Sequence, residues 1–175
     1  YYLPENHQFG LQPRGGDDII VGGAQAWSWV DYRGYNDGDD DGVIVSLSSN
    51  AETVSTADFG SLSVELNIAA NAVGHGVVYD PWGGVDTLTN ISSVRGTDNR
   101  DIFFGSSGDD HFTGYDGNDD FYGYDGDDTF QIGDGAGDRY IDGGDGYDSL
   151  RGHRYNQDIE YLKAVTIDVQ ENTPV

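Results

Sequence analysis

Aspartate recurs at a fixed interval in the second half of the chain, and its spacing indicates cation binding. From Gly96 to Leu150 the sequence divides into blocks of nine residues, one of them expanded to ten, and the sixth residue of each block is aspartate. These six corner aspartates are Asp101, Asp110, Asp119, Asp128, Asp138 and Asp148. If alternate blocks stack at the spacing of paired strands, aligned carboxylates lie about 5 Å apart and repel by roughly 3 kcal/mol per pair. A cation between them removes this repulsion, and oxygen ligands in a chain without Cys suit Ca²⁺ better than Zn²⁺.

The remaining residues of each block predict a tight turn followed by a short strand. The first six are rich in glycine, which accepts the positive φ that other residues resist. The last three are apolar only at their centre, as in a strand with one buried face. The apolar residues are Phe103, Phe112, Phe121, Phe130, Tyr140 and Leu150. Two blocks form one coil of about eighteen residues, so we expect Phe103, Phe121 and Tyr140 to form one inward ladder and the other three to face it.

The blocks resemble the GGxGxDxUx nonapeptides of the RTX, or haemolysin-type, calcium-binding family, whose members fold as parallel β-rolls. The resemblance is strong from Gly83 to Arg151 and weak from Arg14 to Leu47. In that family each Ca²⁺ is held by turn carbonyls and by the sixth-position aspartates of two stacked turns. The resemblance implies ions between Asp101 and Asp119, Asp110 and Asp128, Asp119 and Asp138, and Asp128 and Asp148, hence about four or more. The further ligand positions that it implies are Gly96, Asp98, Gly105, Gly108, Gly114, Asp116, Gly117, Gly123, Asp125, Gly126, Gly133, Gly143, Gly144, Asp145 and Gly146.

The turns depart from the family pattern at their second position. Glycine stands there only at Gly144, and the other blocks have Thr97, Ser106, Tyr115, Tyr124 or Asp134. The carbonyl groups survive these changes, whereas the preference for positive φ does not.

Two acidic segments lie outside the array, the name used here for residues 96–150. Residues 14–23 look like a single degenerate repeat, with Asp18 at the sixth position and Ile20 at the eighth. Asp37, Asp39 and Asp41 have the spacing of a DxDxDG calcium loop, although the later bidentate Glu is missing. A solvated acidic turn and a further calcium site both remain open for this loop.

These patterns together predict an all-β protein: a calcium-bound parallel β-roll, or β-solenoid, with irregular strand-rich flanking segments. We expect a strand-rich N-terminal part at 1–82, the RTX-like β-roll at 83–151 and closing strands at 152–175. Alternating or continuous apolar runs predict strands over 43–47, 62–68, 77–79, 159–162 and 164–169. No segment has a convincing helical period.

Composition excludes several function classes. The formal net charge is -24, with only eight Lys and Arg, which disfavours binding to nucleic acid or to an anionic membrane. No run approaches the roughly twenty apolar residues of a membrane span, and no signal peptide is evident. The chain contains no Met, so we expect it to begin at a processed or cut end.

Two functions fit the sequence, and neither is enzymatic, because the four His match no catalytic motif. One is a calcium-dependent structural or adhesive protein of the cell exterior, such as a self-assembling surface-layer or filament subunit. The other is a non-catalytic module that folds with calcium after export of a secreted enzyme or toxin. Strand-rich segments on both sides of the array favour the first. The expected partners are calcium, a second copy of the chain or cell-surface glycans; turn residues Tyr115, Tyr124 and Tyr147 either bind such a partner or shield the turn edges.

Overall fold

The computed structural model describes residues 9–13, 15–23, 28–33, 42–55, 65–133, 139–152 and 165–169. These residues are all-β in character and include no helix, so none there is long and apolar enough to cross a membrane. The strands are β1 (Phe9–Leu11), β2 (Ile19–Val21), β3 (Ser28–Asp31), β4 (Ile44–Ser46), β5 (Glu52–Ser55), β6 (Glu65–Ile68), β7 (His75–Tyr79), β8 (Val85–Thr89), β9 (Ser93–Arg95), β10 (Ile102–Phe104), β11 (His111–Tyr115), β12 (Asp120–Tyr122), β13 (Thr129–Ile132), β14 (Arg139–Gly144), β15 (Ser149–Gly152) and β16 (Val165–Val169).

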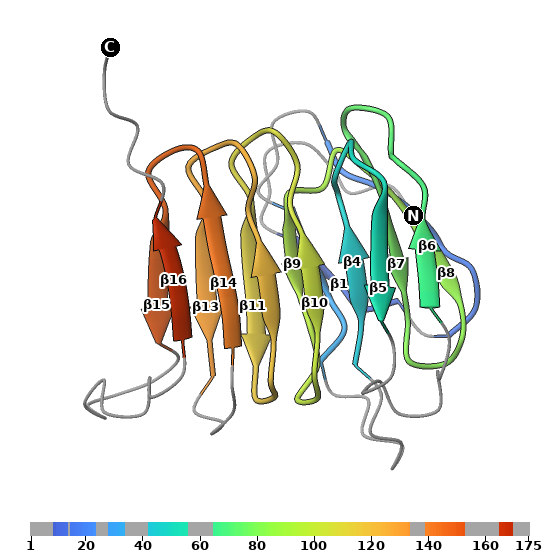
Figure 1. Cartoon of the computed structure of the whole chain (residues 1–175). Coiled ribbons are helices and arrows are strands. Elements are labelled where there is room, and N and C mark those ends of the chain that lie inside the picture. Colours follow the sequence, from blue (N-terminus) through green and yellow to red (C-terminus); the bar gives the residue numbers. More distant parts are fainter. Residues whose placement is uncertain are drawn as a thin grey trace.

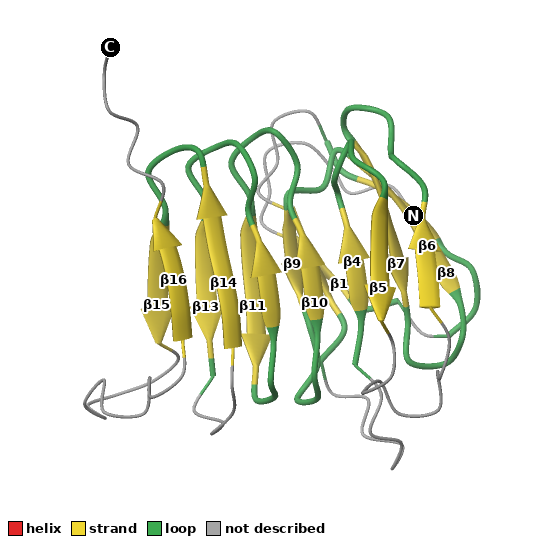
Figure 2. Ribbon diagram, viewed as in Figure 1, coloured by secondary structure: helices red, strands yellow, loops and turns green. Residues whose placement is uncertain are grey.

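From β9 onward, successive strands alternate between two sheets, which face each other along the length of the molecule (Figure 1). The six-stranded sheet has the order β1-β3-β9-β11-β13-β15, and all its pairs are parallel. The eight-stranded sheet has the order β16-β14-β12-β10-β4-β7-β8-β2. It is mixed, because β7 runs antiparallel to both β4 and β8. Turns and loops gather at the two ends of the strands, where the chain passes from one sheet to the other (Figure 2).

The predicted eighteen-residue step is confirmed for the first coils of the array. Phe103 of β10 pairs with Phe121 of β12, and Phe112 of β11 pairs with Phe130 of β13. Parallel pairing at this offset places equivalent positions of alternate blocks beside one another, so the glycine-rich turns stack as well.

The step then lengthens to twenty residues, and this overturns one predicted contact. Phe121 pairs with Ile141, and Phe130 pairs with Leu150. The prediction that Tyr140 belongs to the inward ladder is therefore wrong. Tyr140 pairs with Asp120, and its ring packs at a tilt against that of Tyr122, with the centroids 5.0 Å apart. A shift of one residue moves a side chain to the opposite face of a sheet. A step of nineteen residues would therefore have turned Tyr140 towards the core and Ile141 away from it.

The core lies between the two sheets and is built from the apolar position of every block except the fifth, where Ile141 takes the place of Tyr140. Phe103, Phe112, Phe121 and Phe130 are almost completely buried. The ring centroid of Phe103 lies 5.0 Å from those of both Phe112 and Phe121, so the two ladders also touch each other. The same apolar cluster continues through β9, β3 and β4 to Leu88 and Ile20. One continuous core thus joins the array to the N-terminal strands.

A smaller apolar cluster lies on the other face of the eight-stranded sheet. Val54 of β5 and Ile68 of β6 pack there with Ile44, Ile102 and Phe104. Strands β5 and β6 form an antiparallel pair of their own. This pair covers apolar positions of β4 and β10 that the main core does not use.

The revised register predicts that Ile141 contributes to stability as a core residue. Ile141→Ala should lower the free energy of unfolding by about 2–4 kcal/mol, because Ile141 is 2% exposed. The matched control Ile19→Ala removes the same atoms from a side chain that is 66% exposed and should cost less than about 1 kcal/mol. Urea unfolding in millimolar calcium measures both values, and equal losses would contradict the twenty-residue step.

Candidate metal centre

The corner aspartates are buried although each carries a carboxylate. Asp101, Asp110, Asp119 and Asp128 are at most 2% exposed, and Asp148 is half-buried. Asp138 lies outside the described residues, as do Asp37, Asp39 and Asp41 of the N-terminal acidic loop. Each described corner aspartate follows a glycine-rich turn and directly precedes a strand, so the alternation of strand and turn places it where the chain enters a sheet.

The carboxylates of Asp119, Asp128 and Asp148 accept the same hydrogen bond from the preceding coil. The backbone N–H of Asp101 donates to Oδ1 of Asp119 at 3.1 Å. The N–H of Asp110 donates in the same way to Asp128 at 2.8 Å, and the N–H of Asp128 donates to Asp148 at 2.9 Å. The structure therefore brings together three of the four predicted aspartate pairs.

The second carboxylate oxygen faces the aspartate's own turn. Oδ2 of Asp101 accepts the N–H of Thr97 at 2.9 Å, and Oδ2 of Asp110 accepts the N–H of Ser106 at 2.6 Å. The side chain of Asp101 also accepts the N–H of Val43, so it ties its own turn to the residue that directly precedes β4.

Glycine at the first position is required by the carboxylate itself. A Cβ atom there would lie about 2 Å from an oxygen of the corner aspartate: 2.0 Å at Gly96, 2.1 Å at Gly114, 2.2 Å at Gly123 and 2.1 Å at Gly143. At Gly105 and Gly133 a Cβ atom would instead strike a carbonyl oxygen of the adjacent coil, at 2.3 and 1.7 Å. Any larger residue would push the turn away from the space beside the carboxylate.

The fourth position needs glycine for its backbone in three of the turns. Gly117, Gly126 and Gly146 have φ angles of 128°, 117° and 140°, in the left-handed region that disfavours a side chain. Gly108 differs, since a Cβ atom there would meet nothing closer than 3.9 Å.

The second position has a left-handed backbone at Tyr115 and Tyr124, although not at Thr97 and Ser106. Tyr115 and Tyr124 have φ angles of 63° and 72°, beside 87° at Gly144. A non-glycine residue in this region costs roughly 1–2 kcal/mol, and contacts of the two rings offset it. The hydroxyl of Tyr124 donates to Oε1 of Glu52 at 2.5 Å, and the Arg33 guanidinium lies over the Tyr115 ring, 4.6 Å from its centroid.

The third-position aspartates present their side chains to solvent. Asp98, Asp116, Asp125 and Asp145 are all exposed, and in the described ranges no three acidic, His or Cys side chains converge on one point. Their backbones nevertheless stack: the N–H of Gly126 donates to the carbonyl of Asp145, and the N–H of Asp145 donates to that of Tyr124. Backbone carbonyls, rather than the carboxylates of the third position, are the oxygens near the corners.

In the described part of the chain, the carboxylates of Asp110 and Asp128 lack some of the donors or opposite charges that would stabilise their ionised form. Asp110 Oδ1 and Asp128 Oδ2 are buried and accept no hydrogen bond. Burial raises the pKa of Asp110 to about 6 and that of Asp128 to about 8, and the nearby Asp110 charge adds to the shift at Asp128. The pKa of Asp101 is also raised, chiefly by burial. An ionised carboxylate in such a position costs several kcal/mol unless an opposite charge lies beside it.

These residues fit a hard divalent cation. The available donors are carboxylate and carbonyl oxygens, without any thiolate, which is the ligand chemistry of Ca²⁺. A bound calcium ion would supply the positive charge that two facing corner aspartates lack, and the glycines beside them leave the space for it.

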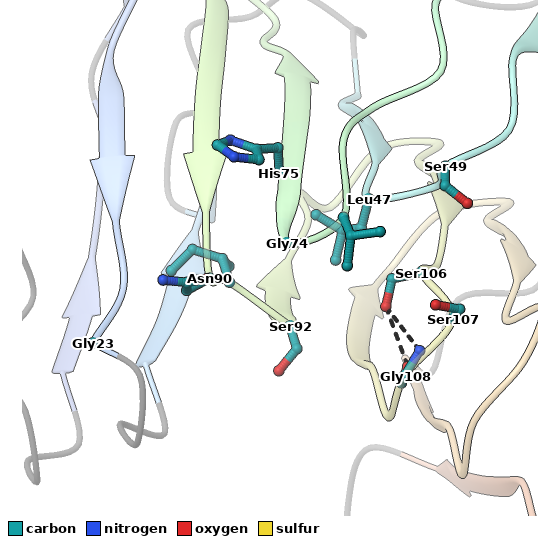
Figure 3. Close-up of a pocket in the computed structure, with 12 residues that line it drawn as sticks. Gly23, Leu47, Ser49, Gly74, His75, Asn90, Ser92, Ser106, Ser107 and Gly108 are labelled. Carbon is teal, nitrogen blue, oxygen red and sulfur yellow. Dashed lines mark hydrogen bonds between the residues drawn. The ribbon is translucent and has the colours of Figure 1, made fainter.

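A separate cavity of about 460 Å³ lies between the β7–β8 end of the eight-stranded sheet and the turn at Ser106–Gly108 (Figure 3). Ser49, His75, Asn90 and Ser92 are among the residues that line it. None of the lining residues is acidic, so this cavity does not share the chemistry of the corners.

Sequence reasoning missed the residues that close the array at its N-terminal side. The N–H of Val43 donates to Oδ1 of Asp101 at 2.8 Å, in the same way as the array's own repeats. A Cβ atom at Gly42 would lie 1.7 Å from the carbonyl oxygen of Arg100, so this glycine permits close approach to the array. The apolar run after Gly42 was the available signal, but a strand alone does not reveal its neighbour.

Comparison with known proteins agrees with this geometry. None of the curated proteins matches the chain. The family model of the RTX calcium-binding nonapeptide repeat matches residues 14–26 and 95–130, in four copies. The matched residues include the turns that carry Asp101, Asp110, Asp119 and Asp128. The chain therefore contains RTX calcium-binding nonapeptide repeats, and its stacked, buried aspartate corners are part of them.

Proposed function

We propose that this protein is a calcium-binding structural or adhesive protein of the cell exterior, whose repeats fold as a parallel β-roll when calcium binds. The observation that carries the proposal is the row of buried corner carboxylates, two of which have an oxygen without any donor. The strand alternation between the two sheets supports the β-roll, because each pair of blocks crosses from one sheet to the other and returns.

The ions lie between Asp101 and Asp119, between Asp110 and Asp128, and between Asp128 and Asp148. The hydrogen bonds that join each of these pairs across coils support this assignment. A fourth ion between Asp119 and Asp138 is implied by the repeats alone, because the pairing of Asp120 with Tyr140 puts residue 139, and not Asp138, beside Asp119. Turn carbonyls of the first four positions supply the remaining oxygens.

Calcium concentration then decides whether the chain folds. At the low calcium concentration inside a cell, burial of several unpaired carboxylates opposes stacking, and the chain stays open for export. Outside, millimolar calcium fills sites of roughly 10⁻⁴–10⁻³ M affinity. One site at tenfold excess contributes about 1.4 kcal/mol, so four sites together are comparable to the stability of a whole domain.

A structural role, without catalysis, is supported by the continuity of the sheets. Strands β1, β3 and β4 join the same two sheets as the array, so the flanking segments extend the stack instead of forming a separate catalytic unit. The partners in this proposal are a second copy of the chain or a cell-surface glycan, and the tyrosine side chains of the turns offer the contact. Tyr147, which is 89% exposed, is the most accessible of them.

Removal of calcium should unfold the array and dissociate any oligomer into monomers. In excess chelator, far-ultraviolet circular dichroism should lose most of its β signal, and sedimentation velocity should show an expanded monomer. In millimolar calcium the β signal should return and species larger than a monomer should appear, because folding creates the surface for association. Magnesium at the same concentration serves as the control, since it prefers a smaller and stricter coordination shell.

A β spectrum that is unchanged by chelator would refute calcium-driven folding. A calcium-loaded chain that sediments only as a monomer at every concentration would refute self-assembly, and it would favour a folding module of a larger secreted protein.

Substitution of two adjacent aspartates, Asp110 and Asp109, tests whether the corner residue is the calcium ligand. Asp110→Asn should raise the calcium concentration at half-folding by about tenfold, equivalent to about 1.4 kcal/mol, because it removes a buried charge that faces the ion. Asp109→Asn, in the same turn but exposed, should change that midpoint less than twofold. Circular dichroism during a calcium titration measures both, and equal midpoints would contradict the assigned ligand.

The raised pKa values predict an unusual pH dependence without calcium. Because the folded chain holds protons on Asp110 and Asp128 that the unfolded chain has already lost, its stability falls as pH rises from about 4 through about 6 and about 8. In chelator the β signal in circular dichroism should therefore be larger at pH 5.5 than at pH 8. The double variant Asp110→Asn, Asp128→Asn should flatten this trend, whereas an unchanged slope would show that other groups cause it.

A further inference from the structure

A corner of the same geometry lies outside the array, where β2 pairs with β8 at one edge of the eight-stranded sheet. Asp86 is completely buried there, and Leu88, two residues later, belongs to the core. Oδ1 of Asp86 accepts the backbone N–H of Asp18 at 2.9 Å. This bond reproduces the one from Asp101 to Asp119, although Asp18 and Asp86 are 68 residues apart.

The second oxygen of Asp86 has a different partner from those in the array. The hydroxyl of Tyr32, itself completely buried, donates to Oδ2 of Asp86 at 2.7 Å. At Asp128 the corresponding oxygen has no donor. A phenol hydroxyl thus occupies, beside Asp86, the place where the array requires a cation.

The other acids at this edge are also satisfied by the chain's own donors. Oδ1 of Asp80 accepts the N–H groups of Trp82 and Gly84, which closes the turn between β7 and β8. Oδ1 of Asp17 accepts the N–H of Val85 at 2.9 Å, which ties the degenerate repeat to β8. The donors in these bonds are all backbone N–H groups of the chain itself.

We propose that the Tyr32–Asp86 pair makes β2 and the β7–β8 hairpin a calcium-independent template onto which the calcium-dependent coils fold. The hairpin is antiparallel and local, so its closure costs little chain entropy. Strand β4 pairs with β7 on one side and with β10 on the other, and it therefore connects the template to the array. The second half of this inference, the calcium dependence of the coils, rests on the proposed function.

Hydrogen–deuterium exchange with mass spectrometry tests the template in excess chelator. In the unmodified chain, amides of 19–22, 76–79 and 85–89 should stay protected, whereas those of 102–104, 111–113 and 120–122 should exchange rapidly. Tyr32→Phe should abolish the protection of the template in chelator, because the buried Oδ2 of Asp86 then has no donor. Tyr124→Phe is the matched control: it removes the same atom from a hydroxyl that also donates to a carboxylate, and it should leave the template protected.

Two outcomes would refute the template. In the first, its amides exchange as fast as those of the array in the unmodified chain without calcium. In the second, they are as well protected in Tyr32→Phe as in Tyr124→Phe. The first comparison needs no variant, so it holds even if Tyr32→Phe does not fold. Protection of the array amides in chelator would instead refute calcium-driven folding, and the effect of Tyr32→Phe on 19–22, 76–79 and 85–89 would still decide the template.

Discussion

A buried carboxylate that lacks an opposite charge is the constraint that shapes this molecule. Asp101 and Asp110 each join their own turn to the next coil, so the stack cannot form without burying them. The same burial disfavours the ionised form that pH 7 would otherwise impose. The aromatic ladders supply apolar burial and the parallel strands supply backbone hydrogen bonds, but neither removes this electrostatic cost. Glycine at the first position of four turns, at Gly96, Gly114, Gly123 and Gly143, follows from it, because the space beside the carboxylate must stay open.

Much of the array could be predicted from its sequence, because every block repeats the same local requirements. The period of nine specified the turns, the buried face of each strand and the eighteen-residue step that pairs Phe103 with Phe121. The lengthened step was predicted in one sheet, where Leu150 was expected beside Phe130. In the other sheet it was not, because Tyr140 and Ile141 are both large residues that suit a strand. The choice between them depends on where the whole strand pairs, and Ile141 fills the core while Tyr140 packs against Tyr122 outside it.

The N-terminal strands were predictable as strands but not as neighbours. Runs of apolar residues indicated β4, β6 and β7, yet nothing in them showed that β4 lies between β10 and β7. The contacts that fix these places join distant residues, such as Val43 with Asp101 and Tyr32 with Asp86. A single tyrosine carries no local signal that its hydroxyl will meet a buried acid. Long-range pairs of this kind occur once each, whereas the array repeats its contacts and thereby reveals them.

The step along the chain changes from eighteen to twenty residues per circuit. The longer step is nevertheless accommodated, because Phe121 pairs with Ile141 in one sheet and Phe130 pairs with Leu150 in the other. The two additional residues therefore fall between Phe130 and Ile141, and the pairs in both sheets remain in register. The length of a connection can thus vary while the strands keep their spacing, so insertions are tolerated between strands and not within them.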